Sequence, residues 1–81
     1  MSELREVLSA RKNVHGDFTD HARIAQALKR EIGDKKLTDV QREALEMILH
    51  KVGRILAGDP DHKDHWVDIA GYATLVADRL T

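Results

Sequence analysis

Apolar residues recur every three or four positions along most of this chain, which is the spacing of one face of an α-helix. The clearest run occupies residues 38–57, and similar runs occupy residues 2–12, 19–32 and 61–80. The positions that form these stripes are Leu4, Val7, Leu8, Ile24, Ala25, Leu28, Ile32, Leu45, Ile48, Leu49, Val52, Ile55, Leu56, Trp66, Ile69, Ala70, Ala73, Val76, Ala77 and Leu80. The chain has no strand-like alternation of apolar and polar residues. The pattern predicts an all-α protein of four helices.

Capping residues and helix breakers separate the four segments. Thr38 and Gln41 form a capping-box pattern, and Asp17 or Thr19 can cap the preceding helix. A Gly-Asp-Pro turn ends the third helix, and proline is favoured where the next helix starts. Short connections make neighbouring helices antiparallel. We therefore expect residues 1–81 to form one domain, a four-helix bundle.

Length, charge and composition restrict the classes of function. The 81 residues include 13 Lys or Arg and 14 Asp or Glu, and the net charge is -1. A nucleic-acid-binding protein is not expected, because contacts to phosphates need a basic excess. There is no cysteine, so a thiolate metal site or thiol nucleophile is excluded. With no membrane-spanning apolar run and no signal-peptide pattern, we expect a cytoplasmic protein without a membrane partner.

Three apolar residues lie off the predicted core stripes: Met47 on the third helix, and Val67 and Leu75 on the fourth. Burying such side chains stabilises an assembly by about 1.5–3 kcal/mol each. We therefore expect a homo-oligomer, although isolated exposed apolar residues are common on any surface. On the fourth helix, Gly71 is expected to allow a neighbouring helix to approach closely.

Carboxylates provide one candidate site. Glu43 and Glu46 share a helical face, as do Asp64 and Asp68 on a later helix, because residues three or four apart are neighbours on a helix. On antiparallel helices the two pairs could converge on Mg²⁺, which prefers carboxylate oxygens and substrate phosphates. The alternative is that they are solvated surface carboxylates, a reading that suits the first pair better than the second.

Lys51 and Arg54 provide a candidate basic site near the end of the third helix. They could complement the helix dipole, pair with the carboxylates of the fourth helix, or bind a phosphate group. A ligand held there would also contact His65 and Tyr72 of the fourth helix.

The histidines lie near predicted connections. His62 and His65 could supply two metal ligands from one helical turn, but zinc needs three or four ligands in register and no such motif is present. We expect His65 to form a hydrogen bond with Asp68 or with a ligand. Residues 15–18 could present amide groups to an anion, or they could form a turn that folds Phe18 into the core. We expect the turn for Gly16 and Phe18, and the roles of His15 and Asp17 stay open.

Four segments carry a distinctive pattern. They are His-Gly-Asp-Phe-x-x-His-Ala-Arg-Ile-Ala-Gln-Ala-Leu-Lys (15–29), Gln-Arg-Glu-Ala-Leu-Glu-Met-Ile-x-x-Lys-x-x-Arg-Ile-Leu (41–56), Gly-Asp-Pro (58–60) and Asp-His-Trp-x-Asp-Ile-Ala-Gly-Tyr-Ala (64–73). The pattern resembles a family of small phage and prophage proteins of unknown function, over roughly residues 13–80. The resemblance implies a phage or prophage origin and a location in the bacterial host cytoplasm. It implies no known reaction.

The layout also resembles, more distantly, the MazG-like all-α nucleotide pyrophosphohydrolases. Their signature is Glu-x-x-Glu on one helix and Glu-x-x-Asp on a later one, which bind the Mg²⁺ that supports cleavage of a nucleoside triphosphate. Glu43 and Glu46 match the first pair. Asp68 matches the second, although His65 stands where the family has Glu. In an alternative alignment, anchored on the end of the helix, Lys51 and Arg54 occupy the positions of the family's first acidic pair. The metal site is then absent.

Three functions therefore stay open from the sequence. The first is a Mg²⁺-dependent nucleotide pyrophosphohydrolase of the MazG-like type. The second is a non-catalytic module that binds a nucleotide or another protein. The third is a structural helical oligomer in which Lys51 and Arg54 pair internally with aspartates. The partner of Asp68 across the bundle distinguishes them, because carboxylates there imply a metal site and cations imply an ion pair or an anion pocket.

Overall fold

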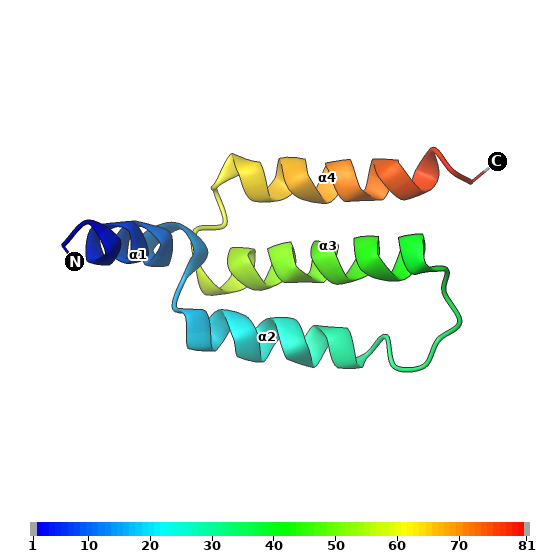
Figure 1. The fold of residues 1–81 in the computed structure, drawn as a ribbon, viewed down its shortest axis with the longest axis horizontal. Coiled ribbons are helices and arrows are strands. Elements are labelled where there is room, and N and C mark those ends of the chain that lie inside the picture. Colours follow the sequence, from blue (N-terminus) through cyan, green and yellow to red (C-terminus); the bar gives the residue numbers. More distant parts are fainter. Residues whose placement is uncertain (1, 81) are drawn as a thin grey trace.

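The computed structural model describes residues 2–80, and all regular secondary structure in that range is helical. The helices are α1 (Ser2–His15), α2 (Phe18–Arg30), α3 (Asp39–Ala57) and α4 (Lys63–Ala77), as Figure 1 shows. The prediction of four helices without strands is confirmed for this range. The first helix is longer than predicted and the last is shorter. No helix in the described range is long and apolar enough to span a membrane.

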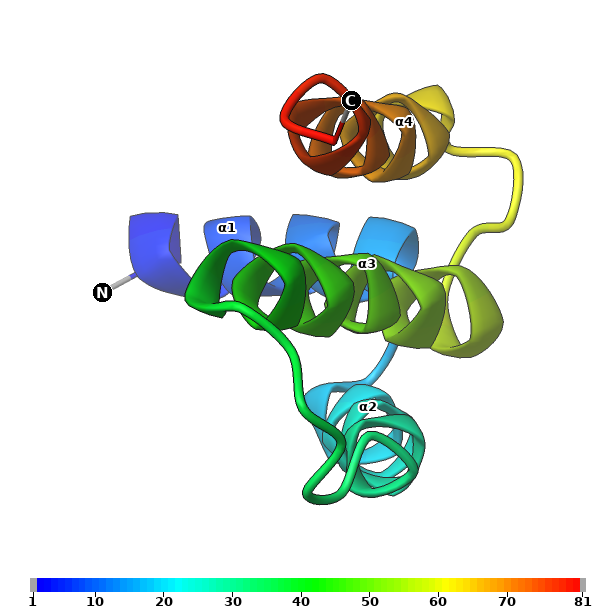
Figure 2. The same ribbon diagram turned by 90° about the vertical axis from the view of Figure 1, so that its right-hand side faces the viewer.

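The third helix is the centre of the structure. α2 and α4 pack against it on different sides, antiparallel to it, and in the described range they do not contact each other (Figures 1 and 2). α1 packs against α2 and α3 and touches α4 through its last residue, His15, and it extends away from the row, which makes the molecule 48 Å long and about half as wide. The helices therefore form an open row of three with one projecting helix.

Side-chain caps set the starts of α2 and α3. The Asp17 carboxylate accepts a hydrogen bond of 2.9 Å from the Thr19 amide. Thr38 Oγ1 accepts a bond of 3.1 Å from the Gln41 amide, and Gln41 Oε1 accepts one of 2.9 Å from the Thr38 amide. These bonds satisfy amides that have no partner within the helix. The predicted capping box is confirmed.

The connection before α2 crosses the connection before α4 at two glycines. Gly16 has φ +87°, and a Cβ built on it would overlap the carbonyl group of Ala57. A Cβ on Gly58 would likewise overlap the backbone of Val14 and His15. The Asp59 amide donates a hydrogen bond of 2.9 Å to the Val14 carbonyl at the same point. This crossing fixes the end of α1 against the end of α3 and the start of α4.

Many apolar side chains remain exposed. Ala25 and Ala44 are the only buried apolar side chains in the described range. Trp66 is 54% exposed and its indole N–H donates to the Pro60 carbonyl at 2.8 Å, so it covers the connection before α4 instead of packing between helices. No atom of a neighbouring helix lies within 4 Å of a Cβ built on Gly71. The expectations that Trp66 packs the bundle and that Gly71 permits a close helix approach are therefore wrong.

The glycine crossing predicts how two matched substitutions affect stability. Gly16→Ala should lower the free energy of unfolding by about 2–4 kcal/mol, because it adds a left-handed non-glycine residue and a backbone clash. Gly71→Ala, in an open helical position, should leave it unchanged or raise it by up to about 1 kcal/mol. Urea unfolding followed by circular dichroism measures both. Equal stability of the two variants would contradict the role given to the crossing.

Candidate functional site

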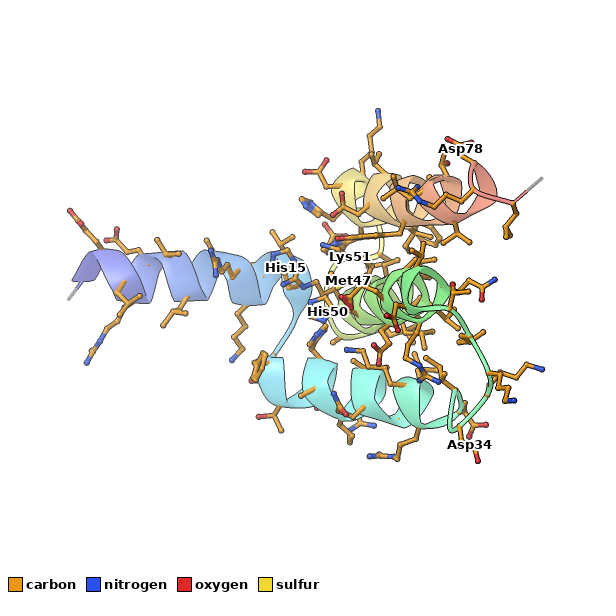
Figure 3. All side chains as sticks on the ribbon, turned by 45° about the vertical axis from the view of Figure 1, so that its right-hand side comes forward. His15, Asp34, Met47, His50, Lys51 and Asp78 are labelled. Carbon is orange, nitrogen blue, oxygen red and sulfur yellow. The ribbon has the colours of Figure 1, made fainter. Side chains whose placement is uncertain are left out.

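A cavity of about 260 Å³ lies where the end of α1, the start of α2 and the second half of α3 meet. The residues that line it are Leu8, Arg11, Lys12, His15, Gly16, Phe18, His21, His50 and Arg54. Arg11, Lys12 and Arg54 are cationic, and none of the lining residues is acidic. Figure 3 shows His15 at the end of α1 close to His50 on α3, in the region where these helices meet. The cavity is thus a cationic pocket built from three helices.

Two cations of this cavity, Arg11 and Arg54, have no counterion among residues 2–80, and Arg54 is the less exposed of the two. Within residues 2–80, no carboxylate lies within 4.0 Å of its guanidinium group, whereas Lys12 has a long contact of 3.8 Å with Asp17 on the exposed rim. Arg54 is only partly exposed. A partly buried cation without a counterion is unfavourable, so this position favours the binding of an anion.

The histidines around Arg54 have lowered pKa values. Burial, followed by the positive charge of Arg54, lowers the pKa of His15 and of His50 to about 4, from an ordinary value of 6.5. The same two causes, in the same order, lower the pKa of His21. These side chains are therefore neutral at pH 7. A neutral imidazole can still donate one hydrogen bond to a ligand.

Two aromatic contacts shape the α2 side of the cavity. The rings of His21 and His50 meet edge to face with centroids 4.6 Å apart, and Phe18 stacks on His21 with centroids 6.1 Å apart. His21 is buried, and its Nδ1 has no hydrogen-bond partner among the described residues. Phe18 is 78% exposed, so the expectation that it folds into the core is wrong. The Asp17 cap makes Phe18 the first residue of α2, where its side chain lies on the rim.

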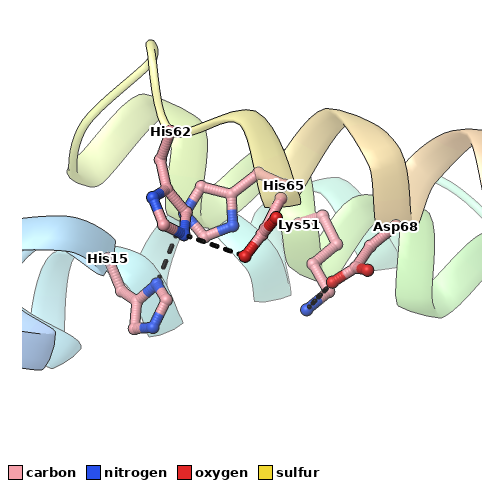
Figure 4. Close-up of polar contacts among 6 residues, drawn as sticks. His15, Lys51, His62, His65 and Asp68 are labelled. Carbon is pink, nitrogen blue, oxygen red and sulfur yellow. Dashed lines mark hydrogen bonds and ion pairs between the residues drawn. The ribbon is translucent and has the colours of Figure 1, made fainter.

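A second histidine group lies beside the cavity at the start of α4 (Figure 4). His15 Nδ1 and His65 Nε2 are 3.3 Å apart, and the rings of His62 and His65 have centroids 4.7 Å apart. His65 is almost completely buried, and burial is the main cause of its lowered pKa. The partner of His65 is therefore His15 and not Asp68, which corrects the expectation for this side chain. Since one ring must accept the hydrogen bond, the pair needs at least one neutral histidine.

Lys51 is the partner of Asp68. Lys51 Nζ lies 2.9 Å from Asp68 Oδ2, as Figure 4 shows. The lysine side chain is 12% exposed and the aspartate side chain 45%. The hydrogen bond from Lys51, together with its charge, lowers the pKa of Asp68 below its ordinary value. The sequence left either carboxylates or cations open as the partner of Asp68 across the bundle. In the structure the partner is a cation, Lys51.

The four carboxylates predicted as Mg²⁺ ligands are not gathered into one site. Glu43 lines a shallow groove with Tyr72, while Asp64 is exposed and lies 3.9 Å from His62. Asp68 is engaged by Lys51. Across residues 2–80, no group of three histidine or acidic side chains is arranged to hold a metal ion. The residues present, Glu46 included, therefore do not fit the metal site that the MazG-like resemblance implies.

The sequence-predicted ligand set is divided between two places. Arg54 lines the cationic cavity. His65 does not line it but contacts His15, which does. Tyr72 lies in open grooves on α4, and Lys51 is held by Asp68. Four residues of the cavity were not predicted as site residues from the sequence: Arg11, Lys12, His50 and Phe18. His50 and Arg54 lie four apart on one helical face, which was the available signal.

Comparison with known proteins identifies a family whose function is unknown. A family model described as a domain of unknown function, DUF6378, matches residues 1–80, so the chain belongs to this family. No curated protein and no solved structure matches the chain significantly.

The ion pair predicts a specific loss of stability. Asp68→Asn should lower the thermal unfolding midpoint by a few degrees, because it leaves the largely buried Lys51 without its counterion. Asp64→Asn is the matched control on the same helix, and should leave the midpoint unchanged because its only ion-pair contact is a long one to His62. Differential scanning calorimetry at pH 7 measures both variants. An Asp68→Asn midpoint equal to that of Asp64→Asn would refute a stabilising pair.

The lowered histidine pKa values predict acid sensitivity. In the unfolded chain His15 and His50 bind protons near pH 6.5, whereas in the folded chain they do so near pH 4. The unfolded state therefore binds more protons between these values, and the free energy of unfolding should fall as the pH falls from about 6.5 towards 4. Urea titrations at pH 7 and pH 5 measure this, and the His15→Gln/His50→Gln variant should show a smaller difference. Equal stability of the wild type at the two values would contradict the assignment.

Proposed function

We propose that this member of the DUF6378 family binds a phosphorylated small molecule, of the nucleotide class, in the cavity between α1, α2 and α3. The observation that carries the proposal is a pocket lined by Arg11, Lys12 and Arg54, with no acidic lining residue. A phosphate group supplies the counterion that Arg54 lacks within the described range.

The chemistry of the lining suits a phosphate. A guanidinium group donates two parallel hydrogen bonds to phosphate oxygens, and such charge-assisted bonds are stronger than neutral ones. The neutral rings of His15 and His50 can add further donors without adding charge. A bound anion would also offset the positive charge of Arg54, which disfavours the protonated form of these rings. The pocket thus favours the binding of an anion that has several acceptor oxygens.

The exposed ring of Phe18 favours a nucleotide over a simple phosphate ester. Ligand pockets usually have volumes of about 300–1,000 Å³, so a cavity of 260 Å³ fits the phosphate end of a nucleotide better than all of it. The base would then lie outside, against the 78% exposed ring on the rim. Stacking of a base on an aromatic side chain contributes about 1–3 kcal/mol.

Binding without hydrolysis is the form of the proposal that the geometry favours. Mg²⁺-dependent cleavage would need Glu43, Glu46, Asp64 and Asp68 to converge, and Asp68 is paired with Lys51 instead. The MazG-like resemblance and the phage or prophage origin remain part of the proposal. They agree with a nucleotide ligand but do not identify its base.

Binding can be tested by isothermal titration calorimetry with pyrophosphate, a nucleoside triphosphate and the matching nucleoside, each with and without Mg²⁺. The two phosphorylated compounds should bind in the absence of Mg²⁺, and the nucleoside should not. Arg54→Gln should weaken binding of both by about tenfold to a hundredfold, through loss of charge-assisted hydrogen bonds. Arg23→Gln is the control, because Arg23 lies on the exposed surface of α2 near Asp20. Wild-type affinity in Arg54→Gln, or no binding by either phosphorylated compound, would refute the proposal.

The same titrations separate the base from the phosphates. Phe18→Leu should reduce the affinity for the triphosphate at least about fivefold and leave the affinity for pyrophosphate unchanged. Phe18→Tyr keeps the ring and should behave as the wild type. Pyrophosphate release, measured with Mg²⁺ on the same samples, reports hydrolysis separately from binding.

A further inference from the structure

The row formed by α2, α3 and α4 has an apolar face that no part of the described chain covers. On α3 this face carries Leu45, Ile48, Val52 and Leu56, with the polar Gln41 at its start, all spaced three or four residues apart and so aligned along one side of the helix. Leu45 and Leu56 are exposed, and Ile48 and Val52 are half-buried. Figure 2 shows the row from its end, with α3 between its two neighbours. The face is defined here as this α3 stripe and the two grooves beside it.

Two shallow grooves flank Leu45, one on each side of α3. The groove towards α2 has a volume of about 440 Å³ and is lined mainly by leucine and isoleucine, with Glu31 and Lys35 as its only charged residues. The groove towards α4 has a volume of about 320 Å³ and has no charged lining residue. Leu37 lines both grooves. The result is an apolar ridge between two apolar depressions, a shape that can interlock with a copy of itself.

The exposed area is larger than a chain of this mass requires. The accessible surface is 6116 Å², whereas a compact folded monomer of 9.2 kDa has about 4,900 Å². The radius of gyration is 14.4 Å, against about 12 Å for a compact domain of this length. A standard protein interface covers about 800 Å² on each partner. Burial of that area would bring the surface per chain close to the value for a compact protein.

We propose that this face pairs with the same face of a second copy, forming a two-fold symmetric dimer. A chain of about 80 residues with two buried apolar side chains needs more apolar burial than it achieves alone. Pairing inserts the Leu45 ridge of each copy into the grooves of the other, and a two-fold axis satisfies both sets of contacts with one geometry.

The dimer leaves the cationic cavity accessible. Arg54 follows Leu45 by nine residues, which is about two and a half helical turns, so the cavity and the apolar face lie on opposite sides of α3. Each copy would thus present its own cavity outward. The inference stands independently of the ligand proposed above, because it uses none of the cavity residues.

Sedimentation equilibrium over a wide range of protein concentration tests the pairing. The wild type should have twice the chain mass of 9.2 kDa, and its thermal midpoint should rise with concentration. Leu45→Glu and Leu56→Glu each place a charge on the proposed interface and should give monomers with retained helical circular dichroism at low temperature. Leu4→Glu is the control, because Leu4 is 52% exposed on the projecting α1, and it should remain dimeric.

Three results would overturn the inference. The first is a wild type that stays at 9.2 kDa at all concentrations. The second is a dimer that survives both Leu45→Glu and Leu56→Glu. The third is a dimer that Leu4→Glu dissociates while the other two variants remain paired, which would place the interface on α1.

Discussion

The backbone crossing between Gly16 and Gly58 is the constraint on which the rest of this structure depends. The turn after α1 lies directly on the turn after α3, so close that neither glycine has room for a Cβ. This contact brings His15 to the start of α4 and to the last turns of α3, although these segments are about 40 to 50 residues apart in the sequence. Next to this contact, the Asp17 cap makes Phe18 the first residue of α2, with its ring on the rim. The cationic cavity exists because the two turns cross there.

Two cations on α3 show how the fold distinguishes a structural charge from a free one. Lys51 and Arg54 are one helical turn apart, and both are partly buried. Lys51 is neutralised by Asp68 at 2.9 Å and so contributes to packing between α3 and α4. Arg54 has no such partner in the described range, and its charge adds to burial, the main cause, in lowering the pKa of the surrounding histidines. A charge that the fold does not neutralise, in a cavity with further donors, is the physical basis of the proposed phosphate site.

The sequence predicted the helices well because their signals are local. The apolar stripes and the Thr38 capping box depend on residues within four positions of each other, and both are present in the structure. The site was predicted only in part. The alternative that pairs Lys51 with an aspartate was available from spacing, but whether Lys51 or the two glutamates of α3 face Asp68 depends on how α3 and α4 rotate against each other. The exposure of the Phe18 ring was missed although the Asp17 cap is a local signal, because what covers the first residue of a helix depends on how distant segments pack.

The central claim is that the unpaired charge at Arg54, rather than a carboxylate-bound metal, receives the ligand. Its most direct test is a nuclear magnetic resonance titration of the labelled protein with a nucleoside triphosphate, in the absence and then in the presence of Mg²⁺. We expect the largest shifts at Phe18, the His15 and His50 rings and the Arg54 side chain, already without Mg²⁺. Shifts confined to Glu43, Glu46, Asp64 and Asp68, and seen only after Mg²⁺ is added, would contradict the account.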